Sequence, residues 1–204
     1  MRTTKRESIC EAALFLIAQN GVDATTTRKI AERAATSEGN LYRHFKSKDD
    51  LVRHLFAHSV ALLHDTLVRS TGDETDPVER LVALMRGVFD FAAEHPEPFN
   101  YLLSVHHTGV LATRDNPLGP LPLQMFVDTI KTGMSSGEFR EVQPVLASGW
   151  MVSMAQRAVV MMASGLISIS QDEVITRTVD AALRLVQNWP EYLSGMPTGS
   201  PRTA

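Results

Sequence analysis

Apolar residues recur at spacings of three and four along most of this chain, which is the repeat of an amphipathic α-helix. The first such face is formed by Ile9, Ala12, Ala13, Leu16 and Ile17. Alternating β-branched runs closed by Asn-Gly or Asp-Gly, which signal strands and hairpins, do not occur. The pattern therefore predicts an all-α protein.

Interruptions of the pattern divide the chain into about nine helices. The first begins near Thr4 and ends before Asn20-Gly21, a typical helix stop. Hydroxyl side chains in the threonine run 25–27, at Ser37 and at Ser47 can cap the next three helices, the last of which runs to about residue 70. The later helices, several opened by proline, are expected at residues 77–95, 98–107, 120–136, 144–164 and 171–189.

Three short helices open the chain, with a tight turn between the second and the third. This is the arrangement of a helix-turn-helix, which offers one helix to the major groove of DNA. The third helix is barely two turns long and holds Leu41 and Phe45 four residues apart as core anchors. We therefore expect a DNA-binding domain at residues 1–48, a helical domain at 49–192 and a flexible tail at 193–204.

The composition is that of an ordinary globular protein: of 204 residues, 44% are apolar and 21% charged, which excludes collagen-like and disordered classes. The single cysteine, Cys10, excludes an internal disulfide. The net charge of -3 conceals a change of sign, because residues 1–55 hold ten Lys and Arg against seven Asp and Glu, and the remainder ten against sixteen. A mildly basic head is compatible with DNA, and its modest charge predicts that affinity depends on dimerisation and correctly placed groups.

One segment is apolar enough to raise the question of a membrane span, since Arg157 is the only charged residue between Val142 and Gln171. We reject a span, because Arg157 at its centre would cost about 2.5–3.5 kcal/mol. A helix that is apolar on most of its circumference is instead expected to be buried in a core or between subunits. Glu7 and Glu11 also interrupt any signal-peptide core, so we expect a cytoplasmic protein.

Two segments of the head carry a specific pattern, TTTRKIAERA at residues 25–34 and SEGNLYRHFKSKDDL at residues 37–51. This pattern resembles the N-terminal domain of the TetR family of bacterial transcriptional regulators, strongly over about residues 6–51 and elsewhere only in helix order and length. The resemblance implies a regulator without enzymatic activity or cofactor. It is expected to act as a repressor that leaves a palindromic operator when a small molecule binds the C-terminal domain.

The resemblance places the DNA contacts on the second, third and fourth helices. Tyr42 and His44 cannot face inward beside the two core anchors, so they are expected to project toward the DNA backbone or groove. Arg28 and Asn40 are the candidates for base edges, since Arg suits guanine and Asn suits adenine. The expected DNA contacts are Thr27, Arg28, Ser37, Glu38, Gly39, Asn40, Tyr42, Arg43, His44 and Lys48.

Two positions depart from the family pattern. Ala35-Thr36 stands where Gly-Val is usual, and a left-handed conformation at Ala35 would cost on the order of 1 kcal/mol. Glu38 stands where a basic residue is common; its carboxylate suits the helix dipole but repels phosphate. Taken singly, most of these side chains also suit a purely structural role, and it is their joint spacing that favours DNA binding.

The helices after residue 70 are expected, by the same resemblance, to bind a small and mostly apolar effector between them. Methionine and aromatic side chains suit such a pocket, although most of them also build an ordinary core. Two roles are open for Arg157, which could neutralise a ligand carboxylate or pair with an acid such as Asp128. The expected pocket residues are Phe89, Phe99, Leu102, His106, Phe126, Met154 and Arg157.

The last two long helices resemble the pair that forms the family's four-helix dimer interface. Small residues such as Ala147 and Ala155 allow close approach, and aliphatic residues supply apolar area. A two-fold dimer would present its two recognition helices to major grooves about 34–36 Å apart. The resemblance thus implies a homodimer on an inverted-repeat operator.

Other readings of the sequence remain open. Asp50, His54 and His58 share one helix face and could bind zinc, but a polar face is the favoured interpretation and no metal is expected. Cys10 lies among apolar residues and is expected to pack rather than react. The competing function is an all-α ligand-binding protein or enzyme without DNA binding, which would show no salt-sensitive retention of duplex DNA.

Overall fold

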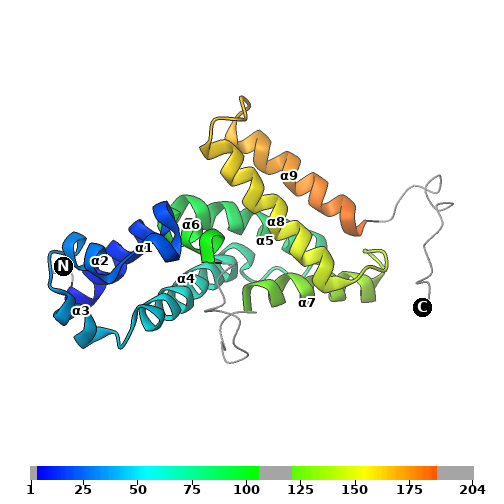
Figure 1. The fold of residues 1–204 in the computed structure, drawn as a ribbon. Helices are drawn as coiled ribbons and strands as arrows, with labels where there is room; N and C mark the ends of the chain where they lie inside the picture. Colours follow the sequence, from blue (N-terminus) through cyan, green and yellow to red (C-terminus); the bar gives the residue numbers. More distant parts are fainter. Residues whose placement is uncertain (1–3, 106–120, 188–204) are drawn as a thin grey trace, which may run out of the picture.

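The computed structural model describes residues 4–105 and 121–187 of the chain. Within these ranges it contains nine helices and no strand, which confirms the all-α prediction. Figure 1 shows a head at one end of the molecule and an elongated body formed by the remaining helices. The head comprises α1 (Lys5–Ala24), α2 (Thr27–Arg33) and α3 (Glu38–His44). The body comprises α4 (Lys48–Thr71), α5 (Pro77–Glu94), α6 (Pro96–Val105), α7 (Leu121–Ser136), α8 (Pro144–Ala163) and α9 (Gln171–Val186).

Side-chain caps fix where the helices of the head begin. The Thr4 hydroxyl accepts from the Glu7 backbone N–H, and the Glu7 carboxylate accepts from the Thr4 N–H in return, which makes a capping box. Thr26 caps α2 and Ser47 caps α4 in the same manner. The predicted stop near residue 20 is visible in the backbone, because Gly21 takes φ 78° and breaks the regular helix before its last turn.

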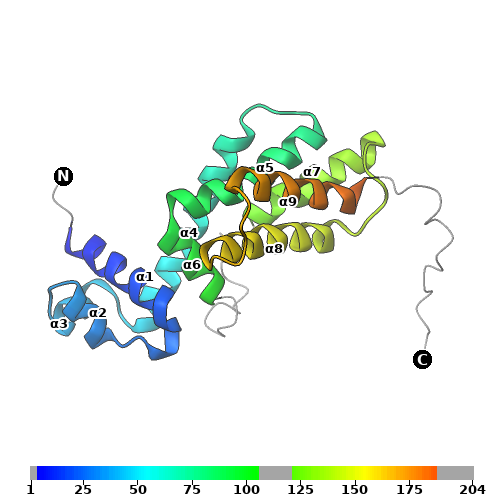
Figure 2. The same cartoon turned by 90° about the horizontal axis from the view of Figure 1, so that it is seen from above.

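The head and the body share apolar packing. α1 packs against α6, and α4 packs against α1, α5 and α6, as the view from above shows (Figure 2). One buried cluster therefore joins the head core, with Ile17, Ile30 and Leu41, to Phe99 and Tyr101 of α6. The domain boundary expected at residues 48 and 49 falls in the first turn of α4 and stays a prediction, since the packing is continuous across it.

α8 and α9 lie side by side along one side of the body (Figure 1). α8 is long and apolar enough to cross a membrane by length and composition alone, yet one of its faces packs against α5, α7 and α9. Its other face leaves Val145, Leu146 and Trp150 about half exposed. The apolar character of this helix is therefore divided between the core and an outward-facing surface.

Some sequence predictions differ from the described structure or extend past it. α6 begins at Pro96, two residues earlier than expected, because the proline that starts it suits the first helical turn. The ends predicted at residues 107, 120 and 189 lie outside the described residues, as do His106 and the tail.

Candidate nucleic-acid interface and internal cavity

α2 and α3 meet through a turn whose shape depends on Ala35. Ala35 takes φ 48°, the left-handed conformation, and no other non-glycine residue in the described ranges has a positive φ. Its N–H donates to the Glu32 carbonyl, and the N–H of Thr36 donates to the Ala31 carbonyl, which is the double hydrogen bond of a Schellman motif. The turn thus keeps the shape that glycine favours, and alanine there is strained.

Burial of two anchors orients α3. Leu41 is completely buried and Phe45 nearly so, which turns Tyr42 and His44 outward and confirms their predicted direction; Tyr42 is 50% exposed. The Ser37 hydroxyl accepts from the Asn40 N–H at 3.1 Å and caps the helix. Of the ten predicted contact residues, six others share this exposed or half-buried surface at the end of the head: Thr27, Arg28, Glu38, Gly39, Arg43 and Lys48.

Several of these polar side chains already bond one another. The Thr27 hydroxyl donates to Glu38 Oε1 at 2.7 Å and lies 3.4 Å from the Tyr42 hydroxyl. Arg28 Nε donates to Glu32 Oε1 at 3.0 Å, and this bond and the two nearby carboxylates raise the pKa of Arg28 above its ordinary value. The surface is therefore an interleaved set of donors and carboxylates rather than a purely basic patch.

The first turns of α4 make contacts with the residues that follow α3. The Lys46 N–H donates to Asp50 Oδ2 at 2.9 Å, and the His54 ring lies 5.5 Å from the Phe45 ring. Burial, followed by the nearby Arg6 guanidinium, lowers the pKa of His54. Asp50 and His54 thus have structural partners, and the described residues contain no group of three side chains placed to hold a metal.

Cys10 packs against the head core as expected. Burial raises the pKa of its thiol to about 11, so the sulfur is protonated at neutral pH. A protonated thiol is a poor nucleophile.

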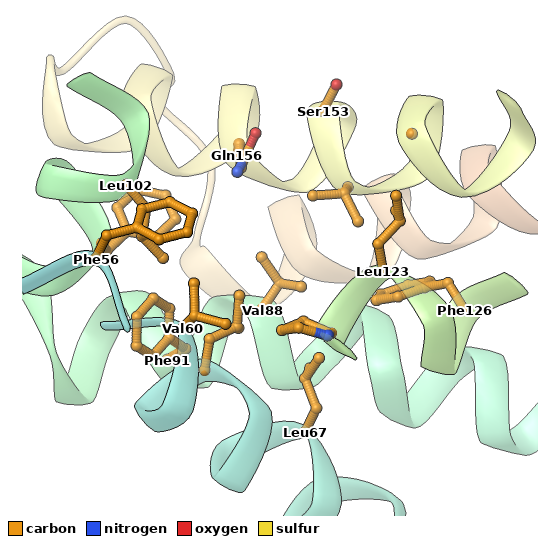
Figure 3. A pocket seen from close by; sticks show the side chains of 15 residues that line it. Phe56, Val60, Leu67, Val88, Phe91, Leu102, Leu123, Phe126, Ser153 and Gln156 are labelled. Atoms are coloured by element: carbon orange, nitrogen blue, oxygen red, sulfur yellow. The ribbon is translucent and has the colours of Figure 1, made fainter. Parts of the chain in front are cut away.

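An apolar cavity of about 300 Å³ lies in the body between α4, α5, α6, α7 and α8. Its wall is made by aromatic and aliphatic side chains, and α8 borders it with the polar residues Gln156, which is half-buried, and Ser153, whose exposed hydroxyl points away from the cavity (Figure 3). No charged side chain is among the described residues of the wall. The lining residues that carry the argument below are Phe56, Val60, Phe91, Phe99, Leu102, Phe126, Gly149, Ser153 and Gln156.

The cavity takes up only part of the predicted pocket. Phe99, Leu102 and Phe126 line it, whereas Phe89, Met154 and Arg157 do not. The reason is helical rotation of about 100° per residue: α5 turns Val88 and Phe91 to the cavity and α8 turns residues 149, 152, 153 and 156, so the neighbouring positions face elsewhere. His106 lies outside the described residues.

The three displaced residues border two surface hollows. Phe89 borders a hollow near the end of α8, and Met154 and Arg157 border one between α8 and α9. Arg157 is exposed, and Asp128, its suggested partner, accepts a hydrogen bond from Gln124 at 2.7 Å. Arg157 and Asp128 form none of the ion pairs found among the described residues, and Arg157 does not line the cavity.

Sequence reasoning missed the contribution of α4 and the polar side of α8. Phe56 and Val60 lie on α4, before the helices after residue 70 among which the pocket was expected. Ser153 and Gln156 gave a usable signal, because two polar residues three apart on an otherwise apolar helix mark one face. Of the two, Gln156 is half-buried at the edge of the cavity and Ser153 is exposed.

The cavity wall is also part of the head's support. Phe91, Phe99 and Leu102 line the cavity and belong to the buried cluster that continues into α1. Tyr101 lies between Phe99 and Leu102 in the sequence, and its buried hydroxyl donates to the Val52 carbonyl of α4 at 2.6 Å. Burial raises the pKa of this tyrosine well above its usual range. A displacement of α6 would therefore change its packing against both α1 and α4.

A larger hollow, about 1070 Å³, lies at the surface beside α1, where head and body meet. Many of its side chains are charged and exposed, among them Lys5, Glu11, Arg33 and Glu97. Such a surface resembles a solvated groove more than a site for an apolar molecule. The smaller apolar cavity is the better candidate for ligand binding.

Comparison with known proteins finds relatives of the head and of the longer chain. Residues 9–55 match the family model described as bacterial regulatory proteins, tetR family. The HTH-type transcriptional repressor KstR2 of Mycolicibacterium smegmatis is 28% identical over 151 residues, which cover 67% of this chain and 68% of that protein.

Two solved structures share the fold over nearly their whole length. A putative tetR family transcription regulator from Shewanella sp. PV-4 has a TM-score of 0.79 at 21% identity, covering 92% of this chain and 100% of that one. The ketosteroid transcriptional regulator KstR2 of Mycobacterium tuberculosis has a TM-score of 0.72 at 21% identity, covering 93% and 98%.

The exposed helix-turn-helix and the helical body with its internal cavity define a DNA-binding transcriptional regulator of the helix-turn-helix class. Residues 9–55 carry the N-terminal domain of the bacterial regulatory proteins of the tetR family, and the fold as a whole is similar to that of solved regulators described as members of that family.

Proposed function

We propose that the protein is a repressor whose hold on DNA is released by a small molecule in the apolar cavity. The observation that carries this proposal is the double use of Phe91, Phe99 and Leu102, which form the cavity wall and pack in the cluster that supports α1. A ligand pressing on this wall moves the element on which the head rests. This arrangement provides a physical route from the cavity to the DNA surface.

The regulator acts as a two-fold dimer through α8 and α9. Support comes from the apolar side chains on this side of the body, where Trp150 is 52% exposed and Leu166 is 71% exposed. Exposed apolar area of this kind is stabilised by burial against a second copy. Two heads related by the dimer axis then meet an inverted-repeat operator in the cytoplasm, where the DNA is.

Release follows from linkage between the two sites. An effector that binds better when the two heads are spread apart weakens operator binding by the same factor by which the operator weakens effector binding. α4 spans the distance between head and cavity, and the Tyr101 to Val52 hydrogen bond ties it to α6. The relative movement of α4 and α6 is thus the step that the effector controls.

The effector is largely apolar and uncharged, and carries one polar group. Apolar side chains form most of the wall (Figure 3), and the half-buried Gln156 of α8 supplies a neutral amide at its edge. A charged ligand group would lie desolvated there without a counter-charge, which is strongly unfavourable. The cavity volume is at the lower end of the range for small-molecule sites.

Selection of genomic fragments by the purified full chain tests the proposed function. Fragments from the source organism are bound at moderate salt, eluted at high salt and sequenced. We expect enriched fragments that share an inverted repeat with half-sites about one or two helical turns apart. Absence of any enriched palindrome, or retention of DNA that does not depend on salt, would contradict the proposal.

A further inference from the structure

Glu38 is the first residue of α3 and lies on the exposed surface of the head. Its carboxylate accepts the hydroxyl hydrogen bond of Thr27 on α2 at 2.7 Å, and the Tyr42 hydroxyl lies 3.4 Å from the same Thr27 oxygen. This carboxylate thus holds a donor that the family resemblance places among the expected DNA contacts. A phosphate oxygen and a carboxylate oxygen both accept a hydrogen bond, so they compete for that hydroxyl.

A second acid repeats the arrangement next to it. Arg28, the candidate for reading a guanine, donates to Glu32 at 3.0 Å, and Glu38 also acts on Arg28 through its charge. Both groups expected to hold DNA therefore have an internal carboxylate partner. A phosphate must displace Glu38 to accept the hydrogen bond of Thr27, whereas Arg28 bonds Glu32 through Nε alone and has further N–H donors for a base.

Displacement has different consequences for different DNA sequences. A duplex that offers only phosphates leaves the Glu38 carboxylate facing negative charge, which weakens binding. A duplex that places an exocyclic amine in the major groove next to residue 38 supplies a new donor, and the N4 amino group of cytosine is the partner that suits Glu in direct readout. Glu38 then loses one hydrogen bond and gains another.

We propose that Glu38 is a specificity-determining residue that disfavours phosphate-only binding and accepts a hydrogen bond from a cytosine amino group in each operator half-site. This inference rests on the proposed function, because it requires an operator. The acid at residue 38 departs from the family pattern, and in this proposal it is the source of the base preference. The acid at residue 38 raises the ratio of operator to non-operator affinity rather than the operator affinity itself.

The test compares the full chain with two variants of Glu38. Glu38→Gln has nearly the same shape without the charge, and Gln suits adenine; we therefore expect the selected operator to change from cytosine to adenine at one position of each half-site. Glu38→Ala has no acceptor, and we expect the preference at that position to fall roughly tenfold. Both variants should bind a non-operator duplex about fivefold more tightly than the wild type.

Glu79→Gln is the matched control for net charge. Residue 79 lies on α5 beyond the far end of α4, a helix of 24 residues and therefore about 36 Å long. We expect this variant to keep the base preference and the non-operator affinity of the wild type. Thermal unfolding followed by circular dichroism establishes that each variant is folded, and the exposed position of Glu38 makes this the expected result.

The outcomes separate this inference from the proposed function. If the wild type selects no palindrome, the proposed function fails. If the wild type selects one and both Glu38 variants select the same bases, the proposal for Glu38 is overturned while the regulator stands. An increase in non-operator affinity equal to that of Glu79→Gln would overturn it as well, because the effect would then be one of net charge.

Discussion

The head and the body of this protein place their functional side chains differently. Those of the head lie on its surface, and those of the body line an internal cavity. In the head, short helices pack around buried side chains, and the side chains expected to contact DNA are the exposed ones. In the body, longer helices enclose a cavity, so the side chains that act are buried or half-buried. Binding of a polar polymer needs the first arrangement and binding of an apolar small molecule needs the second.

The difference extends to how each region tolerates change. The head depends on close packing around a few anchors, because seven-residue helices such as α2 and α3 have little stability of their own. The body has many apolar contacts and an unfilled volume, and so can lose a wall residue at less cost. Substitutions in the two regions should therefore separate in size and in kind.

The largest expected effect comes from matched Leu→Ala substitutions in the two regions. Leu41 is fully buried in the head, and Leu41→Ala should lower the free energy of unfolding by about 2–5 kcal/mol because it creates a new cavity. Leu123 lines the existing cavity, and Leu123→Ala should cost less than about 2 kcal/mol. Urea unfolding at one protein concentration measures both, and equal losses would break the comparison.

Substitutions on the surface of the head should change DNA binding without changing the fold. Arg28→Ala should weaken operator binding by about 1–3 kcal/mol and relax the preference at one base pair. Tyr42→Phe loses one hydroxyl and should weaken binding to all duplexes alike. Fluorescence anisotropy with the operator and its single-base variants distinguishes the two; an unchanged preference in Arg28→Ala would show that Arg28 does not read a base.

The strained turn of the head offers a stabilising substitution. Ala35 takes φ 48°, so Ala35→Gly should raise the free energy of unfolding by about 1 kcal/mol. Ala34 has φ -77° and gains nothing from glycine, so Ala34→Gly is the matched control and should destabilise by roughly 0.5–1 kcal/mol. A lower melting temperature for Ala35→Gly would mean that the turn is not strained.

The smallest effect is a dependence on pH that originates where head and body meet. The pKa of His54 is lowered by burial and by Arg6, so below about pH 6.5 the unfolded chain binds a proton more readily than the folded one. The contribution of His54 to stability is therefore present above that pH and lost as the pH falls below it. Melting temperatures from pH 8 to pH 5 should fall less steeply for His54→Asn than for the wild type. An identical profile for His54→Asn and the wild type would remove His54 from the account.

The head was predictable from sequence because its signals are local. Caps such as Ser37 and Ser47, the stop at Gly21 and the anchors at 41 and 45 act within a few residues of themselves. The outward directions of Tyr42 and His44 followed from the two buried anchors alone. What the sequence did not reveal is the hydrogen bond from Thr27 to Glu38, because it joins two helices across the turn.

The cavity was predictable only in part because its signals are not local. Whether Phe89 or Phe91 faces a ligand depends on how α5 is rotated against α4 and α8, which a pattern that is apolar on most sides does not fix. Phe99 and Phe126 were predicted and line the wall, whereas Met154 was predicted and faces α9. Helix rotation is set by packing, so the lining set required the structure.

The central claim is that occupation of the cavity controls the head, and a side chain placed in the cavity tests it without knowledge of the effector. Gly149 lines the cavity, and a Cβ added there would meet nothing within 4 Å. Gly149→Ala controls for the gain in helix propensity, while Gly149→Phe fills the space with a tethered apolar group.

The measurement is the operator affinity of these two variants by fluorescence anisotropy at one salt concentration. The account predicts that Gly149→Phe binds the operator about 5–150-fold more weakly than Gly149→Ala, the usual range of coupling between two sites. Equal affinities for two folded, dimeric variants would contradict it, because the cavity would then be filled without consequence for the head.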